Sequence, residues 1–241
     1  PPGTLTQTIS IDVNGDTTDE FDETFTVELS NASNVTLDGS GAQVTILDDD
    51  DPPTLSIANA SVTEGNSGTT TSMEFVVTLS APSGKPITVD YMTNAIGGSA
   101  TAGSDYEIAN GTLTFNPDET EKIISVTING DDVDEVDETF QVDLSGEDNV
   151  TIQPSERQAT GTITDDDPLP TATISDATVT EGDSGTVTAV FTVTLSHASE
   201  KMITINYSSA NGSATAGEDF TAVPPSVLTF NPGAPLSQTL P

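Results

Sequence analysis

Apolar side chains alternate with polar ones along the middle of this chain. Met73, Phe75 and Val77 flank Glu74 and Val76, and the same period of two recurs in six further segments. Because successive side chains of a β-strand point to opposite faces, this pattern predicts strands that each bury one face. Abundant Thr, Ser, Val and Ile favour strands as well. We expect strands at residues 55–57, 73–79, 87–91, 113–115, 124–128, 140–144 and 159–163.

These seven strands lie within about 110 residues and are separated by turns rich in Gly, Pro, Asn and Asp. Seven short strands at this spacing are typical of an immunoglobulin-like sandwich, in which two antiparallel sheets pack their apolar faces against each other. The pattern therefore predicts an all-β fold.

The sequence repeats with a period of about 115–117 residues. Val62-Thr-Glu-Gly65 returns as Val179-Thr-Glu-Gly182, and Leu113-Thr-Phe-Asn-Pro117 returns as Leu228-Thr-Phe-Asn-Pro232. A period of this length is a domain rather than a solenoid unit. We predict tandem seven-stranded sandwiches, one complete and two partial: the carboxy-terminal half of a repeat at 1–51, a complete repeat with its linkers at 52–170, and the amino-terminal half of a repeat at 171–241. The first half is expected to hold about three strands and the last about four.

Each half of a sandwich leaves an apolar face without its partner sheet. In the first half this face includes Val27 and Leu29, and in the last it includes Phe191, Val193 and Leu195. Unpaired strand edges pair readily with another chain. We therefore expect neighbouring repeats, or copies of the same chain, to associate head-to-tail, which generates an open filament when the rotation does not close.

The formal net charge of the chain is −35, from 39 acidic and 4 basic side chains. Nucleic acids and anionic membranes are bound through patches of Lys and Arg, so this composition excludes both as electrostatic partners. A high net charge also occurs in disordered chains, but the regular alternation argues for order that depends on a counter-ion. The sequence has no cysteine for a disulfide framework and no apolar run long enough to span a bilayer.

The acidic side chains are concentrated in two segments that recur together. The run Asn14-Gly-Asp-Thr-Thr-Asp-Glu-Phe-Asp-Glu-Thr-Phe25 returns as Asn129-Gly-Asp-Asp-Val-Asp-Glu-Val-Asp-Glu-Thr-Phe140, and each copy is followed by Ile-x-Asp-Asp-Asp, which ends at Asp50 and Asp167. Two like charges 4 Å apart repel by about 4 kcal/mol at an effective dielectric constant of about 20. A cation bound between the two charges makes the net interaction attractive. A dense cluster of oxygen ligands suits Ca²⁺, which binds about six to eight oxygens. The alternative is a solvated acidic linker.

The repeated motifs, together with Ala102-Gly-Ser-Asp-Tyr106 and Asp137-Glu-Thr-Phe140, resemble the Calx-β family. Repeats of this family occur in the regulatory domains of sodium/calcium exchangers, in integrin β4 and in many bacterial surface proteins. The resemblance covers nearly the whole chain. It implies a seven-stranded sandwich with a calcium site in the loops at one end, near the link to the next domain.

Carried over position by position, the resemblance implies Ca²⁺ ligands in all three repeats. The complete repeat offers Glu64, Asp131, the backbone carbonyl of Val133, Glu135, Glu138, Asp165, Asp166 and Asp167. The first repeat offers Asp16, Glu20, Glu23, Asp48, Asp49 and Asp50, and the third offers Glu181. Gly97 and Gly130 stand where the family has acidic ligands, which implies fewer or weaker calcium sites. Glu64 is also compatible with a plain turn.

Catalysis is not expected, because a chain with no Cys and one His cannot assemble the usual nucleophile–base pairs. The function that we predict is a calcium-stiffened segment of an adhesin, stalk or filament, located outside the cell or on its surface. Two alternatives are a calcium-sensing regulatory module and a module that binds carbohydrate or protein. A long run of further repeats favours the stalk, and a flanking transmembrane or enzymatic region favours the sensor.

Overall fold

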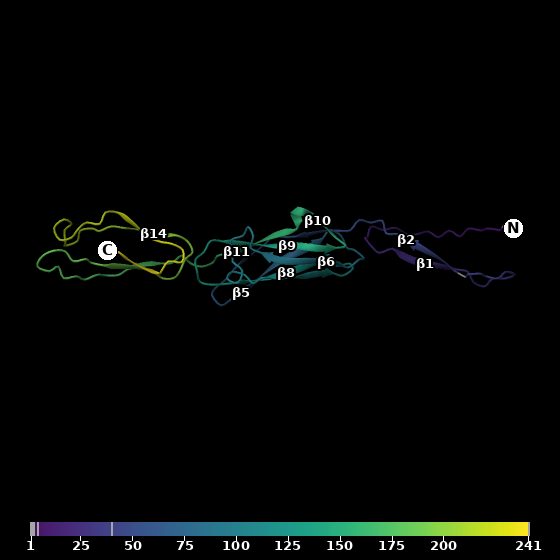
Figure 1. The fold of residues 1–241 in the computed structure, drawn as a ribbon, viewed down its shortest axis with the longest axis horizontal. Helices are drawn as coiled ribbons and strands as arrows, with labels where there is room; N and C mark the ends of the chain where they lie inside the picture. Colours follow the sequence, from purple (N-terminus) through teal and green to yellow (C-terminus); the bar gives the residue numbers. More distant parts are fainter. Residues whose placement is uncertain (1–2, 4, 40, 241) are drawn as a thin grey trace.

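The computed structural model describes residues 3, 5–39 and 41–240, which consist mainly of β-strands and the loops that join them. The chain is elongated, with the complete repeat in the middle and a partial repeat on each side (Figure 1). The predicted all-β fold of tandem sandwiches is confirmed. Among the described residues, no helix has the length and the apolar character needed to cross a membrane.

The complete repeat is a sandwich of two sheets. The first has the strand order β10-β3-β5-β8 and the second the order β4-β11-β9-β6-β7. The strands of the first sheet are β3 (Thr54–Ile57), β5 (Thr70–Leu79), β8 (Glu121–Asn129) and β10 (Thr151–Ile152). Those of the second are β4 (Ala60–Thr63), β6 (Ile87–Asn94), β7 (Asn110–Phe115), β9 (Glu138–Asp148) and β11 (Gln158–Thr164), and the short 3-10 helix η1 (Pro154–Glu156) precedes β11. All seven predicted strands are present, and the short parallel strands β4 and β10 are additional.

The core of the complete repeat follows from the alternation. Met73, Phe75 and Val77 of β5 have no exposed surface, whereas Glu74 between them is exposed. Phe140 of β9 lies between the two sheets, where it stacks on Tyr106 with ring centres 4.3 Å apart and meets Phe75 edge-on at 5.9 Å. Such aromatic pairs add about 0.5–1.5 kcal/mol beyond the burial of their surface. The loop that carries Tyr106 is thereby fixed to the core.

The described residues of the first repeat hold two strands, β1 (Glu23–Glu28) and β2 (Gly41–Ile46), which form an antiparallel hairpin. The expectation of about three strands was wrong, because residues 5–13, the counterpart of β8, form no strand. In the complete repeat β8 pairs with β5, and residues 1–51 contain no counterpart of β5. Val27 is half-buried, whereas Leu29 is 48% exposed.

In the third repeat, residues 171–240 hold five strands rather than about four: β12 (Ala172–Ile174), β13 (Phe191–Leu195), β14 (Ile203–Tyr207), β15 (Ser226–Phe230) and β16 (Ser237–Leu240). The additional strand, β16, pairs with β13, and Val193 and Leu195 are buried in a small core with Leu228, Phe230 and Leu240. The prediction that Val193 and Leu195 form an exposed face was therefore wrong, although Phe191 is 37% exposed. Head-to-tail association with another copy stays a prediction.

Candidate metal centre

Three acidic segments of the complete repeat meet because of the strand register. β9 and β11 are antiparallel, with Glu138 opposite Ile163, so the loop before β9 and the loop after β11 lie at the same end of the sheet. β4 runs parallel to β11, with Thr63 beside Thr164. The backbone N–H of Glu64 continues this pairing by donating to the carbonyl of Thr164 at 3.2 Å. Residues far apart in the sequence thus bring their carboxylates to one end of the sandwich.

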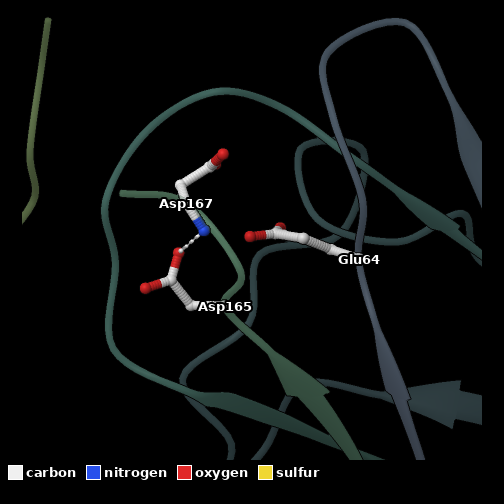
Figure 2. A group of neighbouring side chains, drawn as sticks. All are labelled: Glu64, Asp165 and Asp167. Carbon is white, nitrogen blue, oxygen red and sulfur yellow. Dashed lines mark hydrogen bonds between the residues drawn. The ribbon is translucent and has the colours of Figure 1, made fainter. Parts of the chain in front are cut away.

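The first group of carboxylates consists of Glu64, Asp165 and Asp167, with one oxygen from each lying within 4.8 Å of the others. Figure 2 shows the carboxylate of Glu64 pointing toward the loop that carries both aspartates. Glu64 is 3% exposed. Its Oε1 and the Oδ2 of Asp167 are buried without a hydrogen-bond partner among the described residues. Since buried polar atoms are almost always hydrogen-bonded, these two oxygens indicate a ligand site rather than a plain turn.

The second group consists of Asp105, Glu135 and Glu138, again with one oxygen from each lying within 4.8 Å of the others. Asp105 was not among the ligands expected from the sequence. Its carbonyl accepts a hydrogen bond from the N–H of Asn129 at 2.9 Å, which fixes its loop to the end of β8. The recurrence of its motif, Ala102-Gly-Ser-Asp-Tyr106, as Ala216-Gly-Glu-Asp-Phe220 is a sequence signal that could have identified it.

Burial and the charges of neighbouring carboxylates raise the pKa values of glutamates in both groups. Burial, followed by the charge of Asp131, raises the pKa of Glu64 to about 8. Burial, followed by the charge of Glu200, raises the pKa of Glu135 to about 7. Burial and a hydrogen bond with Asp105 raise the pKa of Glu138 to about 8. The charges of Glu135 and Asp165 also raise the pKa of Glu64, so the two groups influence each other electrostatically.

These pKa shifts predict how the stability of the calcium-free protein depends on pH. A carboxyl group whose pKa is higher in the folded state than its unfolded value of 4.5 contributes fully to stability below pH 4.5. This contribution is lost as the pH rises through the pKa of the folded state. With excess EDTA, we expect the melting temperature of the complete repeat to fall between pH 4.5 and about 8. Thermal melts across this window measure the slope. The double variant Glu64→Gln, Glu138→Gln should flatten it, and an unchanged slope would contradict the assignment.

Three other expected ligands of the complete repeat shape the loops. The N–H of Val133 donates to Asp131 Oδ1 at 2.7 Å. The N–H of Gly65 donates to Asp166 Oδ1 at 3.2 Å, which joins the loop after β4 to the loop after β11. Asp131, Val133 and Asp166 lie outside the two compact groups. The charge of Asp131 nevertheless acts on both Glu64 and Glu135.

The two glycines at expected ligand positions have structural roles. Gly97 has a φ of +82° and faces Gln141, outside both carboxylate groups. A Cβ on Gly130 would overlap the carbonyl oxygen of Gly65 and would lie 2.6 Å from its carbonyl carbon. The loop that carries Glu64 therefore crosses directly over Gly130, and an acidic side chain has no room there.

The first repeat reproduces the loop geometry of the complete one. The N–H of Thr18 donates to Asp16 Oδ1 at 2.8 Å, as Val133 does to Asp131. The six expected ligands line one hollow at the end of the β1–β2 hairpin: Asp16, Glu20, Glu23, Asp48, Asp49 and Asp50. In the third repeat, Glu181 is exposed on a segment without strands and joins neither group.

A clamp of hydrogen bonds and ion pairs, which sequence reasoning missed, joins the complete repeat to the third. Asp134, in the acidic loop, is 1% exposed. Its carboxylate accepts hydrogen bonds from Ser199 Oγ and Lys201 Nζ, both at 2.6 Å. Lys201 Nζ also lies 3.1 Å from Asp165 Oδ2. Burial pushes the pKa of Asp134 upward, but these donors hold it below its usual value.

The same clamp joins the first repeat to the complete one. Lys85 Nζ lies 2.6 Å from Asp19 Oδ1 and 3.1 Å from Asp48 Oδ2, and Ser83 Oγ donates to Asp19 Oδ2 at 3.0 Å. Asp19 is 2% exposed. The recurrence of Ser-x-Lys at both junctions, in a chain with only 4 basic residues, is the sequence signal that was overlooked. We call this arrangement the junction clamp.

Comparison with known proteins identifies one family along the chain. The model of the Calx-beta domain matches residues 1–50, 48–167 and 170–239. Sodium/calcium exchanger 3 of Rattus norvegicus is 44% identical over 101 residues, which are 40% of this chain and 10% of that protein. Sodium/calcium exchanger 1 of Canis lupus familiaris is 53% identical over 57 residues, which are 24% of this chain and 6% of that protein. The chain thus spans a tenth or less of the length of these relatives.

Two solved structures are similar to this chain. The crystal structure of CBD12 from CALX1.2 covers 78% of this chain and 73% of its own, with 22% identity and a TM-score of 0.43. The apo form of the Calx CBD1 domain covers 48% of this chain and 100% of its own, with 26% identity and a TM-score of 0.40.

Proposed function

Because the chain belongs to the Calx-beta domain family, we propose that it is a calcium-binding repeat array in which the ions stiffen the junctions between sandwiches. The observation that carries the proposal is Glu64. A carboxylate that is 3% exposed, with one oxygen unpaired and Asp165 and Asp167 beside it, is costly without a cation. The protein would otherwise hold this group only by keeping it protonated.

The donor set fits Ca²⁺ better than other common metal ions. Every candidate side-chain ligand in the two groups is a carboxylate, whereas zinc sites are usually built from Cys and His. Calcium also tolerates an irregular shell of about six to eight oxygens, which suits side chains from several loops. Glu64, Asp165 and Asp167 would hold one ion and Asp105, Glu135 and Glu138 a second, with Asp131, Asp166 and the Val133 carbonyl nearby. A bound ion supplies positive charge that offsets the repulsion among these groups.

Removing one carboxylate from each group should abolish calcium binding in the complete repeat. In calorimetric titration, we expect the double variant Glu135→Ala, Asp165→Ala to bind fewer calcium ions per chain than the wild type, because the binding heat of the complete repeat is lost. The sandwich core should persist, since neither residue belongs to it. A matched control is Glu74→Ala, Glu121→Ala, which also removes two carboxylates but from exposed positions on β5 and β8. Unchanged stoichiometry in the double variant would contradict the ligand assignment.

We further propose a structural role in an adhesin, stalk or filament outside the cell or on its surface. The tandem order of the repeats and the junction clamp support this role, because both junctions are tied by the same side-chain contacts. The linkers are also short and rich in proline, as at Asp51-Pro-Pro53, which limits their flexibility. This role involves no catalytic chemistry.

Calcium sensing is the second candidate, and the 44% identity to sodium/calcium exchanger 3 favours it. A sensor requires that the ion change the arrangement of neighbouring repeats, whereas a stalk requires that it hold one arrangement. Small-angle X-ray scattering with EDTA and with calcium separates the two. A stalk predicts one mean arrangement of the repeats in both states, with a narrower spread in calcium, and a sensor predicts that calcium changes the mean arrangement.

A further inference from the structure

Glu200 of the third repeat lies against the acidic loop of the complete repeat. Its backbone N–H donates to the carbonyl of Asp134 at 3.0 Å. Ser199 and Asp134 form an isolated parallel bridge, and paired strands lie about 4.8 Å apart. The next residues along the two chains are Glu200 and Glu135, so the bridge places them as neighbours. Glu135 belongs to the second carboxylate group.

The first junction shows where the Cβ of a residue at the position of Glu200 lies. There Gly84 takes the place of Glu200, and its N–H donates to the carbonyl of Asp19 at 2.9 Å. A Cβ built on Gly84 would lie 2.9 Å from Cγ and 3.0 Å from Oε1 of Glu20. Glu20 is the counterpart of Glu135 in the repeated acidic segment. A side chain at this position therefore starts directly beside the glutamate of the acidic loop.

Glu200 is exposed at this end of the sandwich. The first carboxylate group, at the same end, contains Glu64, which is 97% buried and has one oxygen without a hydrogen-bond partner among the described residues. The junction clamp fixes this geometry on both sides of Glu200, through Ser199 and Lys201.

From this geometry we propose that Glu200 is a calcium ligand supplied by the neighbouring repeat, so that the ion held by Asp105, Glu135 and Glu138 bridges the complete repeat and the third. The first junction, with Gly84, has no such ligand. The proposal rests on the proposed calcium binding and adds that the ion directly links the two repeats at the second junction. Calcium then restricts the motion of the second junction more than that of the first, although the junction clamp is the same in both.

Spin labels on each side of a junction test this directly, because the chain has no cysteine of its own. Cysteines replacing the exposed Ser145 and Ser208 span the second junction, and cysteines replacing Ser30 and Ser145 span the first. Pulsed electron resonance gives the distance distribution of each pair with EDTA and with calcium. The variants are Glu200→Gln, which removes only the charge, and Glu200→Gly, which copies the first junction. Glu218→Gln, at an exposed glutamate of the third repeat, is the control.

In the wild type and the control, calcium should narrow the distribution across the second junction. Glu200→Gln and Glu200→Gly should lose most of that narrowing and bind calcium about tenfold more weakly at one site in calorimetric titration. The first junction should respond equally in all variants. If both Glu200 variants keep the narrowing and the affinity, the bridging ligand is disproved while calcium binding itself stands. If the wild type binds no calcium, the proposed function fails and this proposal with it.

Discussion

In millimolar calcium the complete repeat should unfold at a much higher temperature than in excess EDTA. The calcium-free state crowds six carboxylates into two groups, with Glu64 buried and incompletely paired. An ion that binds only the folded state adds a free energy set by its concentration relative to its dissociation constant. At a thousandfold excess this is about 4 kcal/mol. For a domain of this size that corresponds to a rise of about 10 °C or more in melting temperature.

Differential scanning calorimetry at constant ionic strength measures this shift. Magnesium is the appropriate control ion, because it prefers a strict octahedral shell, retains several waters and suits a flexible all-carboxylate site less well. The Glu135→Ala, Asp165→Ala variant should show little shift with calcium. Equal melting temperatures of the wild type in EDTA and in calcium would refute the calcium site.

Replacing Gly130 with alanine should cost the complete repeat about 3 kcal/mol, near the upper end of the range for overpacking. The new Cβ would overlap the carbonyl oxygen of Gly65 and would also lie 2.9 Å from the carbonyl oxygen of Asn66. Both obstacles are backbone atoms, so no side chain can rotate away. The loop after β4 would have to move, and Glu64 with it. We therefore expect weaker calcium binding in addition to lower stability.

Gly15→Ala is the matched control, since Asn14-Gly15 is the counterpart of Asn129-Gly130 in the first repeat. A Cβ on Gly15 meets no atom within 4 Å. Urea denaturation of both variants separates the local clash from the general effect of replacing a glycine in this segment. If Gly130→Ala and Gly15→Ala shift the unfolding midpoint equally, the tight crossing of the two loops is refuted.

Local alternation was sufficient to predict the strands that bury a full face. Met73, Phe75 and Val77 define β5 without any knowledge of its partners. β4 was missed because it is four residues long and only half-buried on one face, and its pairing with β11 joins segments about a hundred residues apart. A short strand of this kind depends on its partner, and a local pattern carries no information about that partner.

The candidate site was predictable to the extent that it recurs in the sequence. Glu135, Glu138 and Asp165 lie in acidic runs that stand out from their surroundings. Asp105 lies outside the acidic runs, and only the folding of its loop against the end of β8 brings it to the site. Lys201 was missed because Ser-x-Lys in a loop between two strands is an ordinary surface sequence. Its role appears only when the next repeat is placed against the acidic loop.

The junction clamp has a geometric consequence for a longer array. Lys85 and Lys201 lie 2.6 Å from the buried aspartate and 3.1 Å from the second aspartate of the preceding repeat. If every junction of a longer array keeps these contacts, each sandwich is placed on the one before by the same rotation and translation, which together are a screw operation. Every added repeat then turns the array by the same angle. A single junction without the lysine would introduce a bend at a defined point along such an array.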